Sequence, residues 1–145
     1  MSLMKRYLGI DFGKARIGLA LSDPLGITAS GLETVRWNGK DLTKALARIT
    51  ELAQKHEVSA FVLGLPKRTD MKEGAAEEAV KAFAARLQEA SGLPVHLRDE
   101  RLTTVVAHRY LRDSTVKKEN KRDVVDQVAA EIILQDFLEE QRRRG

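Results

Sequence analysis

The chain opens with two short apolar segments separated by a glycine-containing turn. Residues 7–12 and 17–22 are mainly apolar, and the tetrapeptide Gly-Lys-Ala-Arg at 13–16 lies between them. This pattern is typical of a β-hairpin. A third extended segment, about residues 27–37, ends at the turn dipeptide Asn-Gly at 38–39. We therefore expect three consecutive strands first.

After these strands, segments with helical and strand periodicity alternate. Apolar positions at helical spacing predict helices at about 41–56 and 76–87, and a C-terminal helix with an apolar stripe over 125–137. Bounded apolar runs at 61–65 and 95–99 predict two further strands, the first of them buried on both faces.

One more helix is expected between the last strand and the C-terminal helix. Thr103 or Thr104 can cap a helix that runs to about Arg112, whereas residues 113–122 lack periodicity and predict a loop. The predicted order is βββαβαβαα. It favours the α/β class, with a mixed five-stranded sheet, the first three strands antiparallel, and helices on both faces. No repeat or linker interrupts residues 1–145, so we expect a single domain.

Composition excludes several kinds of chemistry. The sequence contains no cysteine, which excludes thiolate zinc sites, iron–sulfur clusters and cysteine nucleophiles and suits a reducing cytoplasm. No apolar run approaches the ~20 residues of a membrane span, so we expect a cytoplasmic protein.

The net charge is +4 at pH 7, which is compatible with a polyanionic partner. The excess is concentrated between residues 112 and 122, where five cationic residues face two acids. This segment is either a nucleic-acid contact or an ordinary solvated loop.

Asp11 is out of place inside the apolar segment 7–12, because a carboxylate there costs several kcal/mol unless its charge is satisfied. An ion pair with Arg16 is one explanation. Gly9 and Gly13 favour another, because residues without side chains leave room for a ligand or a metal beside Asp11.

Further acids stand at the end of the fifth predicted strand. Asp99 and Glu100 come where α/β sheets usually place their sites. Strand alternation directs the two side chains to opposite faces, so only one of them should share a site with Asp11.

Asp123 and Asp126 are spaced i, i+3, about 60° apart around the last predicted helix. The small residues Ala129 and Ala130 on that face would let the helix approach the sheet and carry Asp126 toward the strand acids. Stabilisation of the helix dipole is the simpler explanation, above all for Asp123.

Carboxylates from two strands and a helix would repel one another without a cation between them. A hard divalent ion, Mg²⁺ or Mn²⁺, resolves this repulsion, and a pair of such ions can hydrolyse a phosphodiester without a protein nucleophile. The histidines have no metal-ligand spacing, and neither a nucleophile elbow nor a phosphate-binding P-loop occurs.

Four segments, in order, closely resemble the YqgF/RuvX family: GIDFGKARIGLALSD at 9–23, VLGLP at 62–66, DERLTT at 99–104 and VDQVAAEIILQ at 125–135. The resemblance implies a ribonuclease H-like fold related to the junction resolvase RuvC. It also implies a nuclease that matures the 5′ end of pre-16S ribosomal RNA during ribosome biogenesis. Asp11, Glu100 and Asp126 match the acidic active-site positions of the family.

The chain departs from the family pattern at two places. Residues 67–71 read KRTDM where the family usually reads Asn-Met-Asp-Gly, so the backbone of this loop should differ. Asp123 stands three residues before Asp126, as in the paired acids of the resolvase, and is a candidate fourth metal ligand.

The leading hypothesis is a nuclease that uses Mg²⁺ or Mn²⁺ bound by Asp11, Glu100 and Asp126, most simply by a two-metal mechanism. Its partner would be nucleic acid, with pre-rRNA the favoured substrate and structured DNA the alternative. We expect the protein to be a monomer or a weak dimer. Candidate phosphate contacts are the basic residues Lys14, Arg16, Lys67, Arg68, Arg101, Lys117, Lys118, Lys121 and Arg122.

Three alternatives stay open. A Holliday-junction resolvase in DNA recombination and repair would normally act as a dimer. A non-catalytic nucleic-acid-binding protein linked to transcription would not need the clustered acids. Sugar kinases and actin-like ATPases share the Asp-x-Gly hairpin but need two such domains.

Overall fold

The structure of the chain is a computed structural model that describes residues 5–66, 74–102 and 119–144. For residues 119–123 it describes the backbone only. None of the helices in these parts combines the length and the apolar composition that a membrane span requires.

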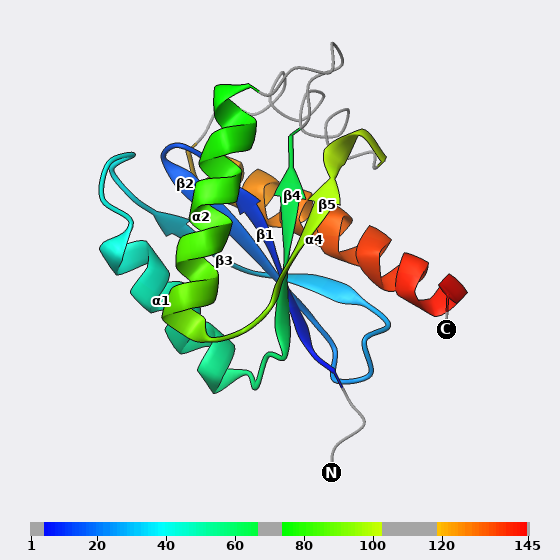
Figure 1. The fold of residues 1–145 in the computed structure, drawn as a ribbon. Coiled ribbons are helices and arrows are strands. Elements are labelled where there is room, and N and C mark those ends of the chain that lie inside the picture. Colours follow the sequence, from blue (N-terminus) through cyan, green and yellow to red (C-terminus); the bar gives the residue numbers. More distant parts are fainter. Residues whose placement is uncertain (1–4, 67–73, 103–118, 145) are drawn as a thin grey trace.

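Five strands form one mixed sheet in the order β3-β2-β1-β4-β5 (Figure 1). β1, β2 and β3 pair antiparallel, whereas β4 pairs parallel with β1, and β5 pairs parallel with β4. The predicted mixed sheet with three antiparallel opening strands is confirmed. The strands are β1 (Tyr7–Phe12), β2 (Arg16–Ser22), β3 (Ala29–Arg36), β4 (Ala60–Leu65) and β5 (Val95–Asp99).

Helices cover both faces of the sheet, as expected (Figure 1). One face is covered by α1 (Thr43–Lys55) and α2 (Ala75–Ser91), and the other by the long C-terminal helix α4 (Glu119–Arg144). A short 3₁₀ turn, η1 (Glu100–Leu102), follows β5.

Helix α1 begins two residues later than predicted, at Thr43. The Asn38 side chain accepts hydrogen bonds from the backbone amides of Lys40 and Asp41, and the Asp41 carboxylate accepts one from the Thr43 amide. Such side-chain turns offer the backbone an alternative to the helix, which delays its start.

The C-terminal helix begins earlier than predicted. The loop expected over 113–122 is wrong for residues 119–122, because α4 starts at Glu119. Glu, Lys and Arg are good helix formers, so this segment can continue the helix without an apolar stripe. The helix expected from Thr103 or Thr104 to Arg112 lies outside the described residues.

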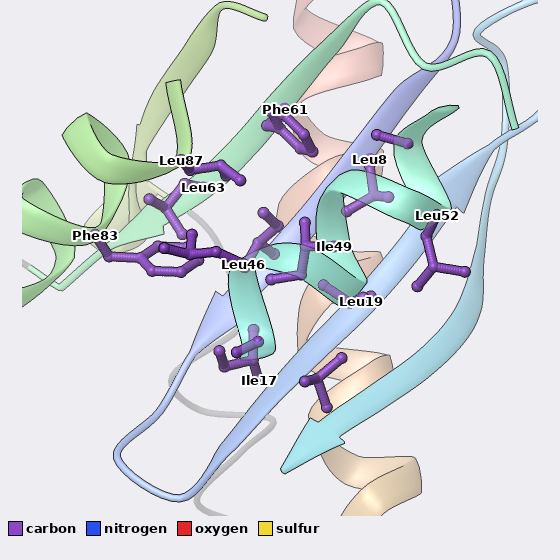
Figure 2. Close-up of a cluster of buried hydrophobic side chains, with 14 of the residues drawn as sticks. Leu8, Ile17, Leu19, Leu46, Ile49, Leu52, Phe61, Leu63, Phe83 and Leu87 are labelled. Carbon is purple, nitrogen blue, oxygen red and sulfur yellow. The ribbon is translucent and has the colours of Figure 1, made fainter. Parts of the chain in front are cut away.

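The larger core lies between the sheet and helices α1 and α2 (Figure 2). Ile10 of β1 and Leu63 of β4 are register partners, and both point into this core with no exposed surface. The next side chain back along β4, Val62, belongs to the smaller core beneath α4. As predicted, β4 is buried along its whole length.

Glycines bring α4 unusually close to the sheet. A Cβ atom built on Gly9 of β1 would lie 2.7 Å from the Cβ of Leu134, and one on Gly18 of β2 would lie 2.1 Å from the carbonyl oxygen of Asp126. Ala129 of α4 is buried at the same interface. The close approach expected from small residues on α4 is confirmed, and it depends equally on small residues in the strands.

We predict that Gly18→Ala lowers the free energy of unfolding by about 1–3 kcal/mol, because the new methyl group would overlap backbone atoms of α4. Gly31→Ala is the matched control. The nearest atoms there are side-chain atoms of Gln127, Oε1 at 2.9 Å and Cβ at 3.1 Å, so the new methyl group would overlap no backbone atom of α4 and a smaller shift accommodates it. Equal losses for both variants in urea denaturation would contradict this account of the interface.

Candidate active site

Asp11 lies between two glycines of the neighbouring strands. Its register partner on β2 is Gly18. On the other side, Ile10 pairs with Leu63 of β4, so Gly64 comes beside Asp11 one residue further along. Register partners point to the same face of a sheet. Asp11 therefore faces α4, with a residue that lacks a side chain on each flank.

The other two predicted acids lie over these glycines. A Cβ atom on Gly18 would be 2.9 Å from the Cβ of Asp126, and one on Gly64 would be 3.0 Å from Oε1 of Glu100. Neighbouring strands are separated by roughly 4.8 Å. Asp126, Asp11 and Glu100 thus follow one another in a row across β2, β1 and β4, which we call the carboxylate row.

An arginine already neutralises one end of the carboxylate row. Nε of Arg16 donates a hydrogen bond of 2.7 Å to Oδ2 of Asp126, and the side chains are only 28% and 18% exposed. Asp11, Arg16 and Asp126 line one pocket of about 280 Å³ together with the β1–β2 turn. The arginine considered for Asp11 from sequence thus forms an ion pair with Asp126.

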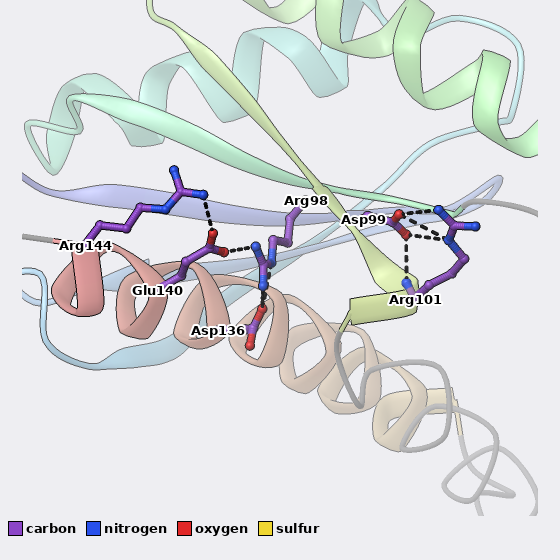
Figure 3. A network of polar contacts seen from close by, with 6 residues as sticks. All are labelled: Arg98, Asp99, Arg101, Asp136, Glu140 and Arg144. Carbon is purple, nitrogen blue, oxygen red and sulfur yellow. Dashed lines mark hydrogen bonds and ion pairs between the residues drawn. The ribbon is translucent and has the colours of Figure 1, made fainter.

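Glu100 joins the row from the position directly after β5, whereas Asp99 does not, in line with the expectation that only one of these two acids lies beside Asp11. β5 ends at Asp99, and Glu100 begins η1, with 4% of its surface exposed. The carboxylate of Asp99 turns the other way, where it accepts hydrogen bonds from the amide and guanidinium of Arg101 at 2.9 and 2.8 Å (Figure 3). These bonds raise the pKa of Arg101 above its ordinary value.

A second ion-pair network fixes α4 against the edge strand β5 (Figure 3). Arg98 of β5 donates to Oδ2 of Asp136 at 2.6 Å and also contacts Glu140, which accepts from Arg144 at 3.0 Å. This positioning network was missed from sequence. The sequence signal that could have revealed it is the four-residue spacing of Asp136 and Glu140, which places both acids on one face of the helix where a strand arginine can pair with them.

Carboxylate oxygens are the donors that Mg²⁺ and Mn²⁺ prefer, so the chemistry of the row fits such an ion. Among the described residues, however, no three His, Asp or Glu side chains gather closely enough to form a complete cation site. Binding would require the acids to close in around the ion, and Asp126 to share its charge between the ion and Arg16.

Only some of the predicted phosphate-binding residues lie in the described parts of the structure. Lys14 is exposed at the β1–β2 turn beside the carboxylate row, and Arg101 is engaged with Asp99. Lys121 and Arg122 belong to the first turn of α4, where their side chains and that of Asp123 are not described. The candidates that lie outside the described residues are Lys67, Arg68, Lys117 and Lys118.

Comparison with known proteins identifies the family. The model of the RuvX family, described as Holliday junction resolvase, matches residues 5–140. The chain belongs to the RuvX family. A relative from Moorella thermoacetica, provisionally named a pre-16S rRNA nuclease, is 46% identical over 140 residues, which cover 97% of this chain and 99% of that protein. A Streptococcus pneumoniae relative with the same name is 44% identical over 135 residues, 92% of this chain and 97% of its own length.

Solved structures place this RuvX-family chain in the ribonuclease H-like fold. Thermus thermophilus RuvC, solved in complex with a Holliday junction substrate, superposes with a TM-score of 0.58 at 16% identity, covering 95% of this chain and 96% of RuvC. The fowlpox virus Holliday junction resolvase gives 0.53 at 14% identity, with coverage of 94% and 99%. The expected fold is thereby confirmed.

We predict that Arg16→Ala lowers the free energy of unfolding in metal-free buffer by about 1–2 kcal/mol, because it removes a hydrogen-bonded cation from the partly buried Asp126 carboxylate beside Asp11. The same substitution in an Asp126→Asn background should cost much less. Denaturant titrations of the four proteins of this double-mutant cycle measure the coupling. Equal costs in both backgrounds would mean that the ion pair carries no stabilisation.

Proposed function

We propose that this RuvX-family chain is a metal-dependent nuclease that hydrolyses phosphodiester bonds in the precursor of 16S ribosomal RNA. The observation that carries the proposal is the carboxylate row, in which three acids from distant parts of the sequence lie over neighbouring strands. Such a set of neighbouring carboxylate oxygens is the kind of donor group that binds Mg²⁺ and Mn²⁺ in proteins. The names of the two relatives favour the ribosomal precursor as substrate.

In this proposal, Asp11, Glu100 and Asp126 hold the divalent ions, with Asp123 as a candidate fourth ligand. Mg²⁺ or Mn²⁺, when bound as a pair, supplies positive charge to both the attacking water and the leaving oxygen of the phosphodiester. Asp11 offers the most rigid carboxylate, since it stands on a strand paired on both sides. Arg16 orients the Asp126 carboxylate through its hydrogen bond.

Burial strengthens the interaction that Glu100 would make with a bound cation. With 4% of its surface exposed, its carboxylate lies in a medium of low dielectric, where its attraction to a cation is stronger than in water. Lys14, exposed on the adjacent turn, is positioned to contact a phosphate next to the scissile one. Because one chain carries all three acids of the carboxylate row, a monomer can form the complete site. A ribosomal precursor as substrate also implies that the protein acts in the cytoplasm.

A second function, cleavage of Holliday junctions, is favoured by the description of the family model and by the resemblance to RuvC. The two are separated by incubating the protein with a labelled pre-16S 5′ leader, a single-stranded DNA and a four-way junction, each with Mg²⁺, Mn²⁺ or EDTA. The main proposal expects metal-dependent cleavage of the leader. Cleavage of the junction alone would favour the resolvase, and binding without any cleavage would favour a non-catalytic role.

The neighbouring residues Asp99 and Glu100 allow a direct test of the site, because only Glu100 belongs to the carboxylate row. We predict that Asp11→Asn and Glu100→Gln each reduce cleavage at least about 100-fold, because a ligand charge is lost from the reacting centre. Asp99→Asn is the matched control and should leave most activity intact, since Asp99 is bonded to Arg101 instead. Single-turnover rates measure all three variants.

The thermal stability of the Asp11→Asn variant should not fall together with its activity. We expect Asp11→Asn to keep or raise the melting temperature in metal-free buffer, because it relieves repulsion within the row. A clearly lower melting temperature would instead identify Asp11 as half of a structural ion pair.

The basic segment before and within the start of α4 is expected to bind rather than catalyse. Replacing Lys117, Lys118, Lys121 and Arg122 together by Ala should weaken nucleic-acid binding and flatten the dependence of log affinity on log salt. Single-turnover cleavage at saturating substrate should fall much less. Replacing Arg142, Arg143 and Arg144 at the other end of α4 serves as the control. An unchanged affinity and salt slope would identify the segment as a solvated surface.

A further inference from the structure

A second pocket lies behind the β1–β2 turn, on the face of the sheet opposite to the carboxylate row. Its volume is about 480 Å³, within the usual range of small-molecule sites. Its walls include the half-buried rings of Phe12 and Trp37, behind which the buried Phe83 packs, and the exposed residues Lys14 and Arg86 also line it. We call it the aromatic pocket.

The rings of the aromatic pocket are held in fixed positions. Phe12 stacks on the buried Phe83 with ring centroids 4.4 Å apart and contacts Trp37 at 5.5 Å. Nε1 of Trp37 donates a hydrogen bond of 2.8 Å to the carbonyl oxygen of Gly13. The half-buried indole is thus fixed in place without a bound partner.

The aromatic pocket and the carboxylate row are joined through the β1–β2 turn. Asp11 and Phe12 are consecutive in β1, so their side chains point to opposite faces of the sheet. Phe12 and Lys14 line both the aromatic pocket and the pocket that holds Asp11 and Asp126. A ligand that follows the turn from one pocket to the other passes Lys14.

We propose that the aromatic pocket binds one unpaired base of the nucleic-acid strand whose backbone reaches the carboxylate row. An unpaired base presents a flat apolar face, for which stacked aromatic side chains are the usual partner. The phosphates on either side of that base match the charges of Lys14 and Arg86. This inference rests on the proposed nuclease function for the course of the strand, and it adds a preference for single-stranded substrate at this position.

The chain supplies its own reporter, because Trp37 is the only tryptophan in the sequence. In EDTA, where the proposed mechanism allows no cleavage, a single-stranded RNA hexamer should quench Trp37 fluorescence in a saturable way. An abasic hexamer with the same number of phosphates should quench it far less. Equal quenching by both would show that the phosphates alone are recognised, and would overturn the proposal.

Filling the pocket gives a second, independent test. Ala82 lies on α2 at the pocket wall and is exposed, so Ala82→Leu should occupy the space of the base without disturbing the core. We expect hexamer affinity to fall on the order of tenfold, as for the loss of one stacked base. Ala85→Leu, at an exposed position of the same helix outside the pocket, should change nothing. Unchanged affinity for both variants would overturn the proposal.

The outcomes separate this inference from the proposed function. Metal-dependent cleavage by a protein that fails both binding tests would retain the nuclease and remove the base pocket. Base-dependent quenching by a protein that cleaves nothing would retain the pocket and remove the nuclease.

Discussion

The close contact between α4 and the sheet is the constraint on which the rest of the structure depends. Glycines within β1, β2 and β4 leave out the side chains that would otherwise keep the helix at an ordinary distance from the sheet. With larger residues at these positions, α4 would lie further from the sheet, and Asp126 further from Asp11. The same glycine, Gly18, that admits the helix backbone also leaves the flank of Asp11 open.

Charge balance follows from this packing. Bringing Asp126 down beside Asp11 sets two carboxylates near each other, and Arg16 on β2 compensates one of them. At the other end of α4, Arg98 draws Asp136 and Glu140 to β5. The helix is therefore held by ion pairs at both ends and by apolar packing between them, which fixes its direction across the sheet.

Much of this architecture could be predicted from the sequence, because strand and helix periodicities are local. The antiparallel opening strands, the fully buried β4 and the apolar stripe of α4 all follow from the spacing of apolar residues. The three acids of the row were selected as a group by their unusual positions and by the family resemblance, and the structure places them over neighbouring strands, whereas their catalytic role stays a prediction.

What could not be predicted depends on tertiary geometry. The partner of Arg16 is Asp126, 110 residues away, and nothing in the local sequence distinguishes it from Asp11. β5 ends at Asp99 as predicted, but the burial of Glu100 over Gly64 depends on the short turn η1 that follows, which was not predicted. The early start of α4 at Glu119 has no apolar signal, because its first turn is polar. The aromatic pocket combines residues from β1, α2 and the segment after β3, whose proximity only the fold creates.

The central claim is that the carboxylate row binds a divalent cation, and anomalous diffraction from crystals grown with Mn²⁺ tests it most directly. The account predicts manganese above Asp11, with Glu100 and Asp126 among its ligands and the Asp126 carboxylate shared with Arg16. Manganese bound elsewhere, or a row that keeps its carboxylates apart at saturating Mn²⁺, would contradict it.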